Sequence, residues 1–279
     1  MPVATIGPYQ IEAEIGRGAT SVVYRARDSR SGRQVALKAL ALNRAFDAEA
    51  FDEARSRFLR EAEAARRLRH PDIVAVLDAG EAGGVAYLAM ELIAGHDLRG
   101  HVAPGQLLPA PQVLQIAARV ADALAYAHSQ GVLHRDIKAA NVLVEPAAGR
   151  VCVTDFGIAR IGDASHTRTG MLLGTPECMA PELLAGQRGD HRSDLYALGV
   201  LLFQLLCGRL PFEAAALGAL MRQVVNDPPP PLHGLRAAMP AALSALVAGL
   251  LAKDAAARPQ DGAEVARELR AIAAGMPPP

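Results

Sequence analysis

The stretch HRDIKAAN at residues 134–141, followed by TDFG at residues 154–157, decides the fold of this 279-residue chain. The first string places a carboxylate, an ammonium group and an amide in one loop, and the second string adds another carboxylate. Carboxylate and amide oxygens are the ligands that Mg²⁺ prefers, and a lysine can act as a point charge on phosphate. The two strings, together and in this order, indicate a site for phosphate and metal rather than an ordinary polar turn.

The sequence before this stretch predicts a small antiparallel sheet with one helix. Alternating or β-branched runs predict strands, and turn residues such as Ser31-Gly32 and Gly83-Gly84 separate them. A run rich in Ala, Glu and Arg predicts a helix, which His70-Pro71 should end. The predicted strands are residues 9–16, 21–28, 33–40, 73–80 and 85–93, and the predicted helix is 47–69.

Helical patterns dominate after residue 95. Pro111 can open a long helix with apolar residues at helical spacing, and Gly131 should end it. Further helices are expected near residues 193–207, 213–226, 240–252 and 262–273. We therefore expect an α+β chain with a boundary near residues 92–96: an extension at 1–8, a β-rich lobe at 9–93, a mainly helical lobe at 94–272, and a Pro-rich tail or linker start at 273–279. A cleft between two such lobes is a preferred place for a ligand.

The predicted sheet carries two candidate phosphate-binding features, each with an ordinary alternative. Gly16 and Gly18 lie on the turn between the first two strands, where glycines let the backbone approach phosphates or simply turn the chain. Lys38 is a single basic residue in an apolar strand, where it can meet phosphate or snorkel to solvent. Glu61 is the candidate acidic partner of Lys38, and Glu53 and Glu63 are rivals on pattern alone.

Composition excludes several classes of protein. Lys plus Arg and Asp plus Glu both count 29, so no net charge attracts nucleic acid or an anionic membrane. Three separated cysteines have no metal-ligand spacing and suggest reduced thiols. The first ten residues lack the features of a signal peptide, and the apolar run at 197–207 is about half the length of a membrane span. We expect a cytoplasmic location, with a membrane tether only if the native chain continues past residue 279.

With these strings, the sequence resembles the eukaryotic-like Ser/Thr protein kinases, most closely the bacterial ones, from about Tyr9 to Ile272. The resemblance implies a bilobal protein-kinase-like fold with ATP in the cleft, and it implies Mg²⁺, with Mn²⁺ as a substitute. Asp136 is then the base for the substrate hydroxyl, Lys138 contacts the γ-phosphoryl group, and Asn141 and Asp155 hold the metal. The remaining residues implied to surround ATP are Ile15, Gly16, Gly18, Ser21, Val23, Ala36, Lys38, Met90, Glu91, Ile93, Asp97 and Leu143, and Lys38 is paired with Glu61.

The segment that follows Asp155 resembles the activation segment of protein kinases, which indicates protein substrates rather than small molecules. Thr175 is implied to hold the catalytic residues and contact the substrate, and Lys138 is typical of kinases that act on Ser and Thr. Arg135 resembles the arginine of kinases that phosphorylation switches on, so Thr167 and Thr169 are predicted autophosphorylation sites, with Ser165 next. Structural roles are implied for Phe156, Gly157, Asp194 and a Glu182–Arg258 ion pair. A homodimer for trans-autophosphorylation is consistent with the resemblance.

Three residues depart from the family pattern. Ser21 stands where many members have a third glycine, Ala139 replaces the usual proline, and Cys178 occupies a position often filled by an aromatic residue, which leaves substrate preference open. The main alternative is a pseudokinase that binds nucleotide as a scaffold, but such a chain would be expected to lack one of Lys38, Asp136, Asn141 or Asp155. A small-molecule phosphotransferase is the second alternative, and the complete activation segment disfavours it.

Overall fold

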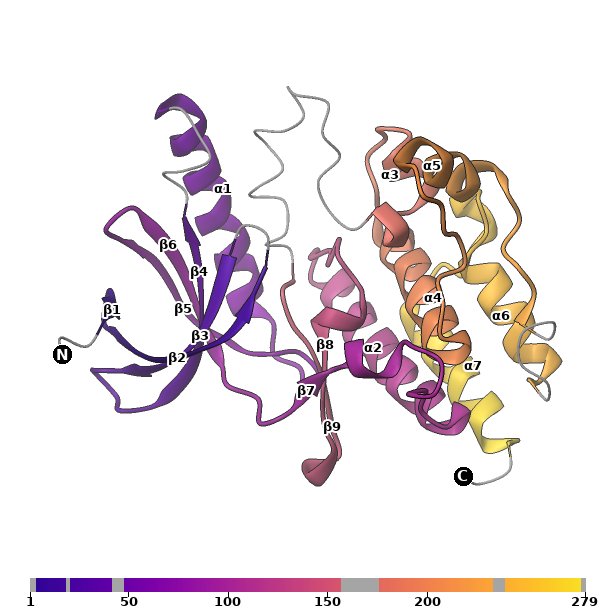
Figure 1. Ribbon diagram of the computed structural model, residues 1–279, viewed down its shortest axis with the longest axis horizontal. Coiled ribbons are helices and arrows are strands. Elements are labelled where there is room, and N and C mark those ends of the chain that lie inside the picture. Colours follow the sequence, from indigo (N-terminus) through magenta and orange to yellow (C-terminus); the bar gives the residue numbers. More distant parts are fainter. Residues whose placement is uncertain (1–3, 19–20, 42–47, 157–175, 233–238, 277–279) are drawn as a thin grey trace. The chain divides into compact units, whose positions relative to one another are not determined.

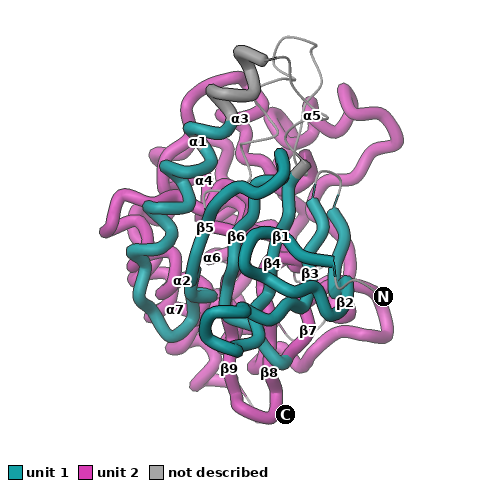
Figure 2. The backbone as a smooth tube through the Cα atoms, turned by 90° about the vertical axis from the view of Figure 1, so that its left-hand side faces the viewer, with its two compact units in different colours: residues 1–94, 157–173 teal, residues 95–156, 174–279 magenta. Residues whose placement is uncertain are grey.

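The computed structural model describes residues 4–18, 21–41, 48–156, 176–232 and 239–276. These residues form two compact units, which Figure 2 colours separately. The first unit holds the described residues up to Ala94, and the second holds residues 95–156 and 176–276. The division between Ala94 and Gly95 lies where the strand patterns of the sequence give way to helical ones.

The first unit is built on a six-stranded antiparallel sheet (Figure 1). Its spatial order is β1-β2-β3-β4-β6-β5, so only the last two strands depart from chain order. Gly83 and Gly84 have positive φ angles of 60° and 76°, which suits the two-residue turn between β5 and β6. The strands are β1 (Thr5–Ile6), β2 (Tyr9–Arg17), β3 (Ser21–Asp28), β4 (Gln34–Ala41), β5 (Val76–Ala82) and β6 (Val85–Glu91).

Two elements of this sheet differ from the sequence-based expectation. Residues 5–6, expected to belong to an extension, pair with β2 as β1, and the amide of Ile11 donates to the carbonyl of Ala4 at 2.9 Å. The predicted start of β5 at residue 73 was wrong by three residues. A turn at residues 71–72 precedes Ile73, whose amide donates to the carbonyl of His70 at 3.1 Å, and Ile73 forms only an isolated bridge.

In the described part of the first unit, one α-helix, α1 (Ala48–Arg67), packs against β5. Phe58, Ala62 and Ala65 recur at helical spacing and are buried, so this apolar stripe is the packed face of the helix. One side of the sheet buries a separate cluster that includes Leu37, and in it the rings of Tyr9 and Tyr87 meet edge to face at 5.5 Å. The helix thus supports the sheet without contributing to that cluster.

The described residues of the second unit form a small sheet and six α-helices. The sheet joins β7 (His96–Asp97), β8 (Val142–Glu145) and β9 (Arg150–Val153) in that order. The helices are α2 (Ala110–Ser129), α3 (Pro181–Leu184), α4 (His191–Cys207), α5 (Leu217–Asn226), α6 (Ala241–Leu250) and α7 (Gly262–Ala274). Four of them lie close to the predicted ranges. The predicted start of α5 at residue 213 was wrong because the Glu213 carboxylate accepts the amide of Leu210 at 2.9 Å, which holds a loop instead.

Helix α4 is the centre of the second unit (Figure 1). It is apolar on nearly all sides, which is typical of a helix buried in a core, and it contacts α2 and α6. A Cβ atom on Gly199 would lie 2.7 Å from the Cβ of Leu250, so only glycine permits this approach of α4 to α6. Within the described residues, no helix combines the length and the apolar character that a bilayer crossing requires.

Candidate functional site

The loop between α2 and β8 brings three predicted site residues together in the second unit: two predicted catalytic residues and one predicted metal ligand. Asn141 donates its Nδ2 to the carbonyl oxygen of Asp136 at 2.7 Å and to Asp136 Oδ2 at 3.0 Å. Lys138 Nζ lies 2.8 Å from the same Oδ2 atom. Both hydrogen bonds from Asn141 to Asp136 use the amide nitrogen, so the Oδ1 atom of Asn141 takes no part in them. The loop therefore holds one carboxylate between an ammonium and an amide.

The pairing of β8 with β9 places Asp155 beside this loop. Val142 is the register partner of Val153, and the amide of Thr154 donates to the carbonyl of Asn141 at 3.0 Å. Asn141 directly precedes β8 and Asp155 follows β9, so both leave the same end of the hairpin. Asp155 has a φ angle of 67°, an uncommon left-handed conformation for a residue with a side chain. The two predicted metal ligands are thus neighbours through backbone pairing.

His134 connects the catalytic loop to the segment that contains Asp155. Its Nδ1 accepts the amide of Asp136 at 3.2 Å, so its Nε2 carries the proton and donates to the Thr154 carbonyl at 2.8 Å. Complete burial lowers the pKa of His134, which keeps the ring neutral. The ring of Phe156 packs edge to face on it at 4.6 Å. His134 and Phe156 therefore join the two motif strings in one packed unit.

Asp194 on α4 supports the start of the catalytic loop. Its Oδ2 accepts the amide of His134 and Nε2 of His128, each at 2.8 Å, and its Oδ1 accepts the amide of Arg135 at 2.7 Å. Burial alone would raise the pKa of Asp194, but its bonds to His128 and its proximity to His134 outweigh burial and hold the pKa below the usual carboxyl value. Arg135 has a φ angle of 69°, so Asp194 fixes an uncommon backbone conformation.

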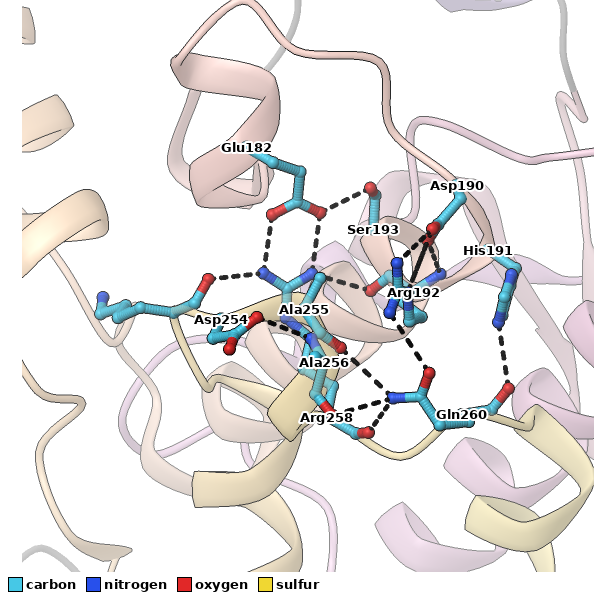
Figure 3. A network of polar contacts seen from close by, with 11 residues as sticks. Glu182, Asp190, His191, Arg192, Ser193, Asp254, Ala255, Ala256, Arg258 and Gln260 are labelled. Atoms are coloured by element: carbon cyan, nitrogen blue, oxygen red, sulfur yellow. Dashed lines mark hydrogen bonds and ion pairs between the residues drawn. The ribbon is translucent and has the colours of Figure 1, made fainter.

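Glu182 and Arg258 form the predicted ion pair, as Figure 3 shows. The two side chains meet through two parallel hydrogen bonds of 2.7 and 2.8 Å. The other three donors of Arg258 reach the carbonyls of Ala252 at 2.8 Å, Arg192 at 3.1 Å and Lys253 at 3.2 Å. Burial would raise the pKa of Glu182, but the bonds from Arg258 and Ser193 lower it. The five guanidinium donors of Arg258 therefore join α3 and α4 to residues 252–253, just before the 255–257 turn.

Asp97 and Leu143, both predicted near the nucleotide, face each other in the small sheet. They are register partners between β7 and β8. The Asp97 carboxylate accepts the backbone amide of Arg99 at 2.9 Å and also pairs with the Arg99 guanidinium at 2.8 Å. Partial burial would raise the pKa of Asp97, but these bonds from Arg99 lower it, so the carboxylate is ionised at neutral pH.

The glycine-rich turn of the first unit has a closed local geometry. Gly16 is the register partner of Val23, and the amide of Gly18 donates to the carbonyl of Ser21 at 2.8 Å. A Cβ atom on Gly18 would lie 3.3 Å from Ser21 Oγ, which is tighter than ordinary contacts. Ile15, just before this turn, is 49% exposed. Ser21, the departure from the family pattern, therefore fits beside Gly18.

Residues predicted to surround adenine and phosphate share one face of the large sheet. Lys38 is flanked by its register partners Val23 and Leu88, and Ala36 pairs with Met90. Alternation along β4 places Ala36 and Lys38 on one side, opposite the buried Leu37. Glu91 and Ile93 lie at and just after the end of β6, and the amide of Glu91 donates to the Ala75 carbonyl at 2.9 Å. Glu61 is half-buried on α1, and its pairing with Lys38 stays a prediction.

Five predicted residues lie outside the described part of the chain. They are Gly157, Ser165, Thr167, Thr169 and Thr175. Sequence reasoning missed His128, which supports Asp194, and Ser193, whose hydroxyl donates to Glu182 at 2.7 Å. Each contact joins residues far apart in the sequence or on different helices, and no motif signals it.

Burial raises the pKa of the Cys178 thiol to about 12, which disfavours a redox role.

Comparisons with known proteins agree with this geometry. A family model described as "Protein kinase domain" matches residues 9–269. Serine/threonine-protein kinase pkn3 of Myxococcus xanthus is 41% identical over 275 residues, covering 95% of this chain and 50% of pkn3. PknJ of Mycobacterium tuberculosis is also 41% identical, over 96% of this chain and 46% of PknJ. This chain therefore spans about half the length of these curated relatives.

A solved structure matches nearly the whole chain. The crystal structure of the Mycobacterium tuberculosis PknI kinase domain superposes with a TM-score of 0.78 at 34% identity. The match covers 96% of this chain and 98% of the PknI domain. The chain thus matches almost all of the PknI kinase domain but only about half of pkn3 and of PknJ.

Proposed function

We propose, from the premise that this chain belongs to the protein kinase domain family, that it transfers the γ-phosphoryl group of ATP to Ser and Thr hydroxyls of proteins. The observation that carries the proposal is the hydrogen-bonded cluster of Asp136, Lys138 and Asn141 beside Asp155. Relatives named as Ser/Thr kinases support the choice of protein substrates. The chain spans about half the length of these relatives, so the activity of a whole protein of that length is likewise a proposal.

Asp136 would accept and orient the substrate hydroxyl. Asn141 and Lys138 both donate toward its carboxylate, and these two contacts hold the carboxylate in one orientation. Lys138, two residues further along, would neutralise charge on the transferred group and release part of its interaction with Asp136. The loop is well suited to positioning, which is the main task in phosphoryl transfer.

The donor set fits Mg²⁺, with Mn²⁺ as a substitute. Asn141 Oδ1 and the Asp155 carboxylate are hard oxygen ligands, and the β8–β9 pairing keeps their backbones adjacent. A metal held by these two residues would supply positive charge that offsets the negative charge of the transferring group. Asn141 would keep its amide nitrogen on Asp136, so a single side chain would couple the metal to the base.

The first unit would hold the nucleotide. Gly16, Gly18 and Ser21 would cover the phosphates, and Lys38, fixed by Glu61, would contact the α- and β-phosphoryl oxygens. Val23, Ala36, Met90 and Leu143 would enclose the adenine, with Glu91 and Ile93 offering backbone groups to its edge and Asp97 reaching the ribose. The position of Ala36, Lys38 and Met90 on one face of the sheet supports the proposal that this face binds the nucleotide.

Regulation by phosphorylation would use the same loop. Arg135 directly precedes Asp136, so a phosphate on Thr167 or Thr169 could pair with its guanidinium and order the segment. We include autophosphorylation in the proposal, with a homodimer as the route for transfer in trans. Phosphopeptide mapping after incubation with ATP tests this part, and unmodified Thr167 and Thr169 would remove it.

The test of the proposal is phosphate transfer from labelled ATP with Mg²⁺ to a generic basic protein and to the chain itself. Asp136→Asn and Lys38→Met should each lower kcat/KM by several orders of magnitude, because both act in transition-state stabilisation. Asp122→Asn, which removes a surface carboxylate bonded to Arg270 on α7, is the matched control and should retain activity. No transfer by the unaltered chain, with ATP still bound, would favour the pseudokinase scaffold.

A further inference from the structure

An ion pair joins α1 to the edge of the large sheet in the first unit. Arg55 Nε donates to Glu81 Oε2 at 2.5 Å, and Glu81 lies on β5, the last strand in the spatial order of the sheet. The two side chains are 47% and 25% exposed, so the carboxylate is the more shielded of the two. Arg66 and Arg67, by contrast, pair with Glu63 within the helix. Arg55 therefore ties the helix to the sheet.

The buried face of α1 lies between Arg55 and Glu61. Phe58, Ala62 and Ala65 form this face, and each is less than a tenth exposed. With about 100° of rotation per residue, Arg55 lies about 60° to one side of the buried face and Glu61 about 60° to the other. The helix thus rests on an apolar stripe with one charged side chain on each flank. A rotation of the helix that moves Arg55 away from the sheet also moves Glu61.

Glu81 and Lys38 lie on the same face of the sheet. Glu81 is the register partner of Ala86, and Ala86 is the partner of Leu40 on β4. Direct partners share a face, and so do alternate residues along one strand, which places Lys38 on the face of Leu40 and Glu81. The predicted partner of Glu61 is therefore on the face that α1 contacts through Arg55.

The spacing along the helix is compatible with the spacing across the sheet. Glu81 and Lys38 are two strands and two residues apart, which is about 12 Å on a sheet with about 4.8 Å between strands. Arg55 and Glu61 are six residues apart, or about 9 Å along the helix axis. The lengths of the side chains cover the difference, so one position of α1 can hold both contacts.

We propose that Arg55 and Glu81 are positioning residues, which set the rotation of α1 and thereby present Glu61 to Lys38. This role rests on the proposed function, in which Lys38 contacts the inner phosphates of the nucleotide. An ion pair near the surface changes an equilibrium by up to about fivefold, so the pair biases the helix between two rotations and does not lock it. The phosphate site is thereby coupled to the charge at the outer edge of the sheet.

The test is a charge swap, read by the affinity for a non-hydrolysable ATP analogue with Mg²⁺ in calorimetry and by kcat/KM. Arg55→Glu and Glu81→Arg should each lower both quantities about two- to fivefold, and the double variant should return both toward the values of the unaltered chain. Arg66→Gln removes an arginine of the same helix that pairs within it, so this matched control should change neither. Single variants that behave like the control, or a swap as weak as the weaker single variant, would overturn the proposal.

A second cycle separates positioning from a general effect on the fold. In a Glu61→Gln background, Arg55→Glu should have no further effect on the affinity, because no carboxylate remains to be presented to Lys38. Equal losses with Glu61 and with Gln at this position would show that Arg55 does not act through Glu61. The affinity measurement needs no phosphate transfer, so it decides the role of Arg55 even if the chain proves inactive and the proposed function fails.

Discussion

Replacing Asp194 with Asn tests the support of the catalytic loop with almost no change in side-chain size. The carboxylate accepts three hydrogen bonds, two at Oδ2 and one at Oδ1, from His128 and from the amides of His134 and Arg135. An amide has only one oxygen, so its NH₂ group must face one of these donors. The best orientation keeps both bonds at the oxygen and leaves the Arg135 amide opposite another donor.

The expected loss follows from this count. A lost hydrogen bond to a charged group and a buried N–H left without an acceptor together cost about 3–5 kcal/mol. A domain of this kind has a free energy of unfolding of about 5–15 kcal/mol, so the variant should fold but with a much lower urea midpoint. Arg135, at a φ angle of 69°, would lose the acceptor that holds it, and a small displacement of Asp136 can cost about 100-fold in kcat.

The pH dependence of the free energy of unfolding gives a second, independent test. The pKa of Asp194 is lower in the folded chain than its ordinary value of 3.8, so the carboxylate stabilises the fold above that value. This contribution is lost as the pH falls through the folded pKa, and the Asn variant should lack it. Asp190→Asn is the control, since Asp190 caps the same helix and Asn caps equally well, so its cost should stay within about 0.5 kcal/mol. An Asp194→Asn variant as stable and active as the control would show that Asp194 does not support the catalytic loop.

Three further changes test other parts of the structure. Arg258→Lys should lower the free energy of unfolding by about 2–4 kcal/mol, because lysine cannot replace five buried donors, and a double-mutant cycle with Glu182→Gln in urea should show strong coupling. Gly199→Ala should cost about 1–3 kcal/mol by thermal unfolding because its Cβ would meet Leu250, and an unchanged Tm would contradict that packing. Cys178, with a pKa of about 12, should react with iodoacetamide at pH 7.5 far more slowly than a free thiol, and rapid labelling would contradict this raised pKa.

Local patterns predicted most of the first unit because its strands pair with their neighbours along the chain. Alternation and glycine turns predicted β2, β3, β4 and β6 within a few residues. The strand β1 has only two residues, and its pairing with β2 depends on a backbone partner that no periodicity reveals. Very short strands fall below the length at which alternation carries information.

The candidate site could be predicted as a set of residues but not as a geometry. Asp136, Lys138 and Asn141 lie within one loop, so their proximity follows from sequence. The contact of Asp194 with His134 joins residues 60 positions apart, and His128 is an ordinary residue of an amphipathic helix until that contact is known. Such pairs depend on the packing of α4 against α2, which no local signal specifies.

The most direct measurement is a crystal structure of the chain with Mg²⁺ and a non-hydrolysable ATP analogue. We expect a metal at about 2.0–2.1 Å from oxygens of Asn141 and Asp155, with the terminal phosphoryl group near Asp136 and Lys138. We also expect Lys38 on the inner phosphates of the same nucleotide. A nucleotide bound elsewhere, or a metal that touches neither Asn141 nor Asp155, would show that these residues do not form the proposed site.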